Sequence, residues 1–267
     1  MVQLPPELID IILDLLHDDK PALLACSLVH KTWTHTARYQ LFADVDIDVG
    51  RMNGLRLLQP GSVAIPYVRR LRIVVRVGWP FWNYTLSSLA AFERIQSVSF
   101  AHLHWYFTKP CAQSEFLNKF ATATRLCLYE TTTTLTSLAH MIAAFSRLDT
   151  LVVDKIYLIL CDWDQYPLST IRPPRDLHAL ELHSCNAYVL LPWLGSSGIT
   201  LRCVSLCEIS ANHIQPFLDA IGSSLEEFWC EPRPERLHGA SCLRESTPPS
   251  PFSNTVPRIR TRLDLCL

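Results

Sequence analysis

The first apolar residues of the chain recur at helical spacing. Two neighbouring stripes run along positions 5 to 16: Leu8, Ile12, Leu15 and Leu16, then Ile9, Leu13 and again Leu16. Pro5 and Pro6 suit the first turn of a helix because they have no amide to donate, and Glu7 complements the positive end of the helix dipole. The pattern predicts a helix over 5–16 with an apolar arc wider than one core contact requires.

Two further short helices are predicted before residue 43. Asp18 and Asp19 can cap the second helix, and Pro21 fits its first turn. Its apolar residues are Leu23, Leu24, Cys26, Leu28 and Val29, and those of the third helix are Trp33, Ala37 and Leu41 at i, i+4 and i+8. Three short helices cannot enclose all of this surface by themselves. We therefore expect another polypeptide to cover part of it.

Beyond residue 60 a different pattern repeats. Each repeat has three apolar residues at positions i, i+3 and i+5. Its central positions are Leu71, Val98, Leu126, Leu151, Leu180, Val204 and Phe228. The last two apolar positions of each triplet alternate like a strand with one buried face. Helices are predicted between them at 85–94, 112–121, 134–146 and 211–221, and a loop at 154–176.

The central positions follow one another with a period of roughly 24 to 29 residues, which is typical of leucine-rich repeats, whose strand and helix units stack into a solenoid. The repeats are irregular, since only residues 177–185 resemble the full consensus. The expected fold class is α/β, with a curved parallel sheet whose convex side carries helices and loops. A generic α/β domain with a mostly parallel sheet is the alternative. The expected domains are a helical domain at 1–45, a linker at 46–64, a repeat domain at 65–232 and a flexible tail at 233–267, in which Arg258, Arg260 and Arg262 form a solvated basic cluster.

The N-terminal residues resemble an F-box over positions 3–45. The resemblance rests on Leu4-Pro5-Pro6-Glu7-Leu8, the Asp turn, Leu23-Leu24, Cys26-Ser27-Leu28-Val29, Lys31 and Trp33, ending at Leu41-Phe42. His30 departs from the pattern, because many members have Cys there. The resemblance implies binding to a Skp-type adaptor of a cullin and RING ubiquitin ligase. The implied adaptor-facing residues are Leu4, Pro5, Leu8, Ile12, Leu28, Val29, Lys31 and Trp33.

With irregular leucine-rich repeats behind it, this arrangement resembles F-box proteins of mushroom-forming fungi. The alternative is a helical cap that buries the same stripe against the rest of the chain. If the repeats align, residues flanking each inward pair face the concave side and run from basic to acidic along it. The expected client-binding residues are Arg70, Arg72, Arg125, Tyr129, Glu181, His183, Glu227 and Trp229. A client protein of complementary charge is the expected partner.

Composition favours a folded protein of the cytoplasm, the nucleus or both. A net charge of -1 and a pI near 6.8 give no general attraction for nucleic acid, and no segment has the roughly 18 consecutive apolar residues of a membrane span. Asp10 and Asp14 interrupt the N-terminal apolar run, which argues against a secretory signal. The 10 cysteines form no CxxC pair and are interpreted as reduced core residues.

Enzyme motifs are absent from the sequence. Gly195-Ser196-Ser197-Gly198 is not the GxSxG elbow of hydrolases, and neither GxxxxGK[ST] nor GxGxxG occurs. No catalytic, cofactor-binding or metal-binding residue is therefore predicted. The expected function is a non-catalytic substrate receptor of an SCF-type ubiquitin ligase. The alternatives are a stand-alone repeat scaffold and a hydrolase whose catalytic residues converge only in the fold.

Overall fold

The architecture comes from a computed structural model of the chain. The structure describes residues 5–49, 56–75, 89, 92–108, 110–159, 168–183 and 188–231. Leu4, the predicted tail at 233–267 and most of the predicted helix at 85–94 lie outside these residues.

Three helices form a head at the N-terminal end: α1 (Pro6–Leu15), α2 (Lys20–Val29) and α3 (Lys31–Phe42). The three predicted helices are thus confirmed. A side-chain oxygen of Asp19 accepts the Ala22 amide at 3.0 Å and caps α2. His30 caps α3, because its Nδ1 accepts the Thr32 amide at 3.3 Å.

The head has a small apolar core of its own. Ile9, Leu13, Leu23 and Ala37 are buried together, and Leu16, Cys26, Trp33 and Leu41 pack partly buried around them. Polar contacts fix α1 against α3, since Thr36 donates to Asp10 at 2.9 Å and Gln40 donates to Asp14 at 2.5 Å. This core is separate from the larger apolar core beneath the sheet.

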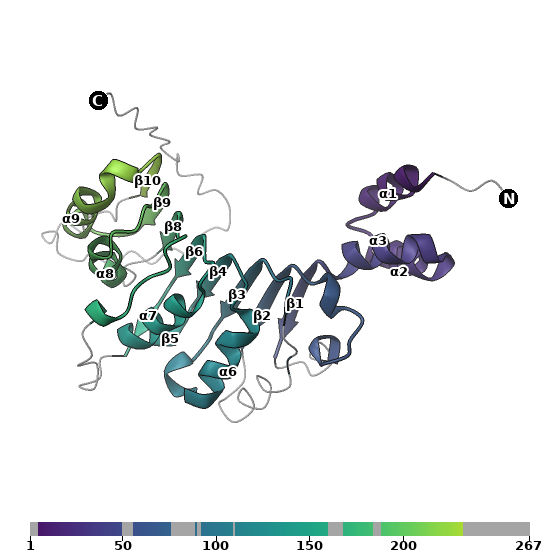
Figure 1. Cartoon of the computed structure of the whole chain (residues 1–267), viewed down its shortest axis with the longest axis horizontal. Coiled ribbons are helices and arrows are strands. Elements are labelled where there is room, and N and C mark those ends of the chain that lie inside the picture. Colours follow the sequence, from purple (N-terminus) through teal and green to yellow (C-terminus); the bar gives the residue numbers. More distant parts are fainter. Residues whose placement is uncertain are drawn as a thin grey trace, which may run out of the picture.

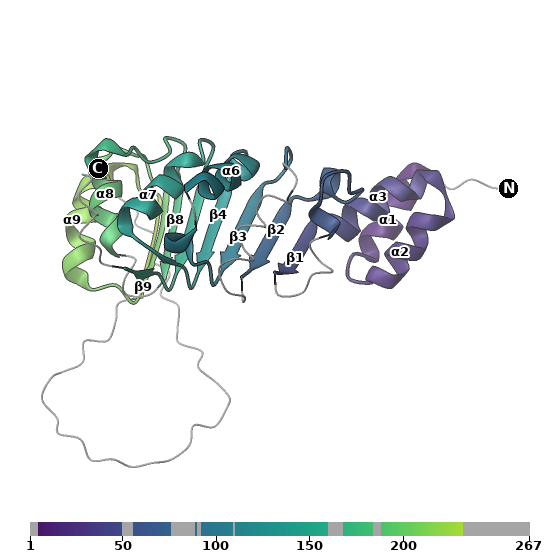
Figure 2. The same cartoon turned by 90° about the horizontal axis from the view of Figure 1, so that it is seen from below.

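The rest of the described chain is built on one parallel sheet of eight strands. In sheet order these are β1 (Asp44–Asp48), β2 (Arg70–Val74), β3 (Ser97–Ala101), β4 (Arg125–Tyr129), β6 (Thr150–Asp154), β8 (Ala179–His183), β9 (Cys203–Cys207) and β10 (Glu227–Glu231). Spatial order follows chain order, so each strand pairs with the next one in this series. The head projects from the β1 end of the sheet, far from β10 (Figures 1 and 2).

Four helices lie along one face of the sheet (Figure 1): α6 (Pro110–Phe120), α7 (Leu135–Ala144), α8 (Leu190–Ser196) and α9 (Ala211–Ile221). Short 3-10 turns are η1 (Arg56–Leu58), η2 (Ile65–Tyr67), η3 (Trp105–Phe107), η4 (Leu168–Thr170) and η6 (Gly222–Ser224). A second, two-stranded sheet joins β5 (Thr132–Thr133) to β7 (Tyr157–Leu158). The opposite face of the main sheet is called the open face below.

The predicted register of the strands is confirmed. Leu71, Val98, Leu126, Leu151, Leu180, Val204 and Phe228 are consecutive cross-strand partners. A second regularity lies just before the strands, where each of seven backbone carbonyls accepts two amides from the following unit at 2.8 to 3.0 Å. These carbonyls belong to Ala43, Arg69, Gln96, Thr124, Asp149, His178 and Arg202. The units therefore stack in a constant way although their lengths differ.

Three sequence-based expectations need correction. β1 was not predicted, and it crosses the expected boundary between the helical domain and the linker at residue 45. α8 was also not predicted. Within the predicted helix at 85–94, residues 92–94 are not helical, and residues 93–94 form a turn.

A buried threonine breaks the apolar pattern after β4. Leu103, Ile156 and Ile209 are buried two residues beyond their strands, and Thr131 holds the same place after β4. Among the described residues the Thr131 hydroxyl has no hydrogen-bond partner. It therefore loses its hydration on folding without compensation.

Thr131→Val should raise the free energy of unfolding by about 1 kcal/mol, because valine keeps the shape and removes the unsatisfied hydroxyl. Thr133 is the matched control, since it is equally buried but its hydroxyl donates to the Thr134 carbonyl at 3.1 Å. Thr133→Val should lower stability by about 1 kcal/mol. Urea unfolding measures both, and equal losses in the two variants would contradict the assignment.

Candidate protein-docking surfaces

The α1 helix exposes a complete apolar face. Leu8, Ile11, Ile12 and Leu15 lie at i, i+3, i+4 and i+7 and are all exposed. The other sides of α1 are occupied, because Ile9 and Leu13 fill the head core and Asp10 and Asp14 bond to α3. Of the two stripes predicted for this helix, Ile9 and Leu13 therefore face the head core, whereas Leu8, Ile12 and Leu15 face solvent.

The α2 helix exposes a second apolar set of Leu24, Leu28 and Val29. Leu28 on α2 and Leu15 on α1 are each 78% exposed. We call Leu8, Ile11, Ile12, Leu15, Leu24, Leu28 and Val29 the head apolar surface. In the part of the chain that the structure describes, seven of the nine exposed large aliphatic side chains belong to it; the other two are Leu57 and Val63. Exposed aliphatic surface this concentrated is typical of an interaction site.

Most of the residues carried over from the F-box resemblance are accessible. Leu8, Ile12, Leu28 and Val29 belong to the head apolar surface, and Pro5 and Lys31 are also exposed. Trp33 differs, because it is half-buried against the head core and so contributes to folding as well as to the surface. Leu4 lies outside the described residues. Ile11, Leu15 and Leu24 were not among the expected contacts, and their positions beside Leu8, Ile12 and Leu28 on the helix surfaces are the signal that identifies them.

The predicted charge gradient of the open face is wrong at its first strand. β1 places three acidic residues, Asp44, Asp46 and Asp48, ahead of the arginines of β2. Asp44 and Asp46 are the cross-strand neighbours of Arg70 and Arg72. Arg70 makes a two-point ion pair with Asp44, donating from Nε and Nη2 to the two carboxylate oxygens. The N-terminal end of the face is therefore mixed in charge, not basic.

In the middle of the open face, one ion pair spans three strands. Arg125 on β4 donates to Glu181 on β8 at 3.1 Å, across the intervening strand β6. Cys127 and Val152, which lie close to these charges on β4 and β6, are buried. His183 Nε2 lies 3.8 Å from the second carboxylate oxygen of Glu181. The neighbouring His183 imidazole, opposed by partial burial and assisted by the Arg125 guanidinium, lowers the pKa of Glu181.

Glu181→Gln should reduce stability in a pH-dependent way. A lowered folded-state pKa means that ionised Glu181 stabilises the fold above its ordinary pKa of 4.5, and that this contribution is lost as the pH falls through the folded-state pKa. Because Glu181 is partly solvated, we expect no more than about 1 kcal/mol. Urea unfolding of both proteins should show the difference at about pH 6, and the difference should shrink as the pH falls below 4.5. A difference that does not change with pH would rule out this origin.

The predicted client-binding residues do not converge on one compact site. Arg125, Tyr129, Glu181 and His183 lie together in the middle, where partial burial raises the pKa of Tyr129. Arg70 and Arg72 lie on β2, whereas Glu227 and Trp229 lie on β10. At a strand spacing of about 4.8 Å these two pairs are separated by roughly 29 Å. Only an extended partner can contact the whole set.

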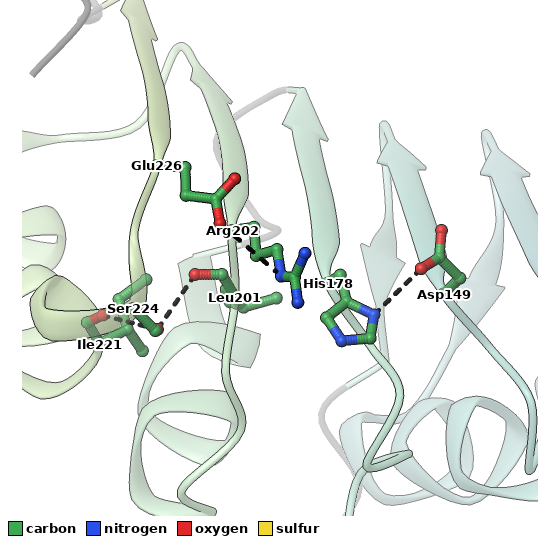
Figure 3. A network of polar contacts seen from close by, with 7 residues as sticks. All are labelled: Asp149, His178, Leu201, Arg202, Ile221, Ser224 and Glu226. Carbon is green, nitrogen blue, oxygen red and sulfur yellow. Dashed lines mark hydrogen bonds and ion pairs between the residues drawn. The ribbon is translucent and has the colours of Figure 1, made fainter.

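A polar row follows the edge of the sheet where the strands begin (Figure 3). Asp149 contacts His178 Nδ1 at 3.0 Å, and Arg202 lies 3.8 Å from Glu226. Ser224 donates to the Leu201 carbonyl at 3.0 Å, which ties η6 to the preceding unit. These contacts join consecutive units. A hydrolase would need a serine or cysteine nucleophile beside its histidine. In the described part of the chain, no serine or cysteine is hydrogen-bonded to the His178 ring.

The described residues form neither a metal-binding cluster nor a membrane-spanning helix. No group of three or more His, Cys, Asp or Glu side chains there is arranged to hold a metal ion. No described helix has the length and apolar character needed to cross a bilayer.

Comparison with protein-family models and with curated proteins finds no match to this chain.

Proposed function

We propose that this protein is the substrate-recognition subunit of an SCF-type ubiquitin ligase. In this proposal the head binds a Skp-type adaptor, and the sheet behind it holds a client protein. The adaptor is linked to a cullin and a RING subunit, which bring the ubiquitin-charged enzyme. The protein itself supplies no bond chemistry.

The head apolar surface is the observation that carries the proposal. The head core is closed without these seven side chains, so they are not needed to hold the three helices together. They do not pack on the sheet either, as a helical cap would require, because they are exposed in the complete chain. Burying one such leucine in an interface contributes on the order of 2 kcal/mol. The surface is thus suited to a stable contact with another polypeptide.

The sheet supports an irregular leucine-rich-repeat interpretation. Its strands are parallel and follow chain order, and the central positions of the sequence repeat are in register across them. The constant pattern of doubly accepting carbonyls adds a structural repeat to the sequence repeat. Repeat folds of this type present an extended side-chain surface on the open side of the sheet.

A client on the open face would be held at a fixed distance from the adaptor. Because the head and the open face belong to one chain, binding both partners raises the local concentration of client lysines near the ubiquitin-charged enzyme. The mixed charge of the face, with Asp44 to Asp48 at one end and Glu227 and Glu231 at the other, favours a client with basic segments at two separated places.

Co-purification with a Skp-type adaptor tests the proposal directly. The full chain should retain the adaptor, and a chain lacking residues 1–42, which ends the deletion at the last residue of α3 and keeps β1, should not. Val63→Ala changes an exposed aliphatic side chain outside the head and should behave like the unmodified chain. Failure of the full chain to retain the adaptor would refute the proposal and leave a stand-alone repeat scaffold as the better description.

A further inference from the structure

The exposed apolar face of α1 is bordered along one side by carboxylates. They follow one another at i, i+3, i+7 and i+11, the last of them in the turn after the helix, and all are exposed: Glu7, Asp10, Asp14 and Asp18. We call these four residues the acidic stripe. Glu7 and Asp14 are direct neighbours of Ile11 on the helix surface, because they precede it by four residues and follow it by three. The acidic stripe therefore forms one rim of the head apolar surface.

The acidic stripe is unfavourable for α1 itself. Asp10 lies three residues after Glu7 and four before Asp14, and like charges at these spacings repel each other. Asp14 also lies in the last turn, where the negative end of the helix dipole favours a cation, and α1 has no basic residue there. A partner that brings positive charge to this side of α1 would relieve both effects.

The described part of the chain does not supply that charge. Two carboxylates of the stripe accept hydrogen bonds from α3, but the donors are a neutral hydroxyl and a neutral amide. Among the described residues the stripe makes one ion-pair contact, in which the His17 ring lies 3.0 Å from Asp18, and it makes none with a lysine or an arginine. Positive charge along the whole stripe would therefore come from another molecule.

The apolar row of α2 is bordered by the opposite charge. Lys20, Leu24 and Leu28 follow one another at intervals of four residues, so the lysine lies at one end of the row. Lys31, the first residue of α3, comes three residues after Leu28. Both lysines are exposed, and neither makes an ion pair with any residue that the structure describes. The head apolar surface is thus acidic at its α1 side and basic at its α2 side.

We infer that the partner of α1 is an amphipathic helix with lysine or arginine side chains along one flank. The inference rests on the proposed function, in which this helix belongs to the Skp-type adaptor. The exposed apolar residues of α1 have the spacing of a ridge that packs into the groove of another helix. The basic flank pairs with the acidic stripe, and acidic side chains of the adaptor lie near Lys20 and Lys31. An α1–α1 contact between two copies of the chain is disfavoured, because it would bring two acidic stripes together.

Charge reversal in the full chain tests the inference by surface plasmon resonance with the purified adaptor. Glu7 and Asp18 suit the test because neither contacts α3 through a hydrogen bond in the structure. Glu7→Lys with Asp18→Lys should slow association by about tenfold at low salt, since charges at the rim of an interface act mainly on the association rate. Between about 50 and about 500 mM salt the unmodified chain should lose about tenfold in association rate, and the variant should lose much less.

Glu93→Lys with Asp176→Lys is the matched control. It makes the same change of net charge at two exposed carboxylates outside the head. This variant should associate with the adaptor at the unmodified rate and keep the unmodified salt dependence. Equal slowing in the two variants would assign the effect to net charge and overturn the inference. Equal melting temperatures of the unmodified chain and the Glu7→Lys, Asp18→Lys variant would show that the slower association does not come from unfolding.

The inference and the proposed function fail in different ways. If the unmodified chain binds the adaptor and the charge-reversed chain associates at the same rate, the basic flank is refuted while the proposed function stands. If the unmodified chain does not bind the adaptor, both are refuted. Elution of the free chain as a dimer that charge reversal dissociates would place the positive charge on a second copy, and would also overturn the inference.

Discussion

Leu28→Gln should weaken adaptor binding by about a hundredfold or more while leaving the free protein equally stable. Leu28 is 78% exposed in the chain, so glutamine removes little packing, and both residues favour helices. In the proposed complex the leucine is buried, and its loss costs about 2 kcal/mol. Burying the glutamine amide without a partner adds about 1 kcal/mol or more, and a total of about 3 kcal/mol corresponds to the expected loss of affinity. Titration calorimetry with the purified adaptor measures it.

Leu57→Gln is the matched control for this prediction. It makes the same chemical change at an exposed leucine in η1, outside the head. Its affinity for the adaptor should equal that of the unmodified chain. If both variants bind normally, the head apolar surface is not the docking site. If Leu28→Gln also lowers the melting temperature of the free protein, then Leu28 stabilises the fold as well, and the assumption that it does not is incorrect.

Much of the sheet could be predicted from sequence because its strands bury one face in a strict alternation. In β2, for example, Leu71 and Ile73 point into the core, and Arg70 and Arg72, which alternate with them, point to the open face. β1 was not predicted, because its Asp-Val-Asp-Ile-Asp pattern has only two apolar positions and begins directly after the third helix. α8 was not predicted, because its seven residues include a proline and a glycine, which both disfavour a helix.

Charge pairs across the sheet follow less directly from the local sequence than apolar packing does. Arg125 and Glu181 belong to units that are not consecutive in the chain, and they meet only because β4 and β8 flank the same strand. Arg70 was assigned to a client surface, but its guanidinium is paired with Asp44 on a strand that was not expected. Pairings of this kind depend on register across strands, which local pattern does not contain. For the head, by contrast, helical periodicity predicts two apolar stripes, of which the structure buries Ile9 and Leu13 and exposes Leu8, Ile12 and Leu15.

Phe116→Ala should lower the melting temperature of the chain by about 10 °C. Phe116 on α6 is fully buried, and its ring lies 4.8 Å from that of Phe100, 4.9 Å from Phe120 and 5.5 Å from Trp105. These rings join α6 to β3 and η3, so truncation leaves a cavity where two units of the sheet meet. Such a cavity costs about 4 kcal/mol, and alanine does not weaken the helix itself. For a chain of 267 residues this corresponds to the stated shift, which circular dichroism measures.

The matched control for Phe116 is Phe107→Ala, because Phe107 is 46% exposed at the end of η3. Its truncation should cost no more than about 1 kcal/mol, since little apolar area returns to water. Equal shifts in the two variants would mean that the cluster around Phe116 does not support the sheet. Because the head core shares no residue with this cluster, Phe116→Ala should still bind the adaptor with unchanged affinity below its melting temperature. Loss of adaptor binding well below that temperature would instead show that the head depends on the sheet for its fold.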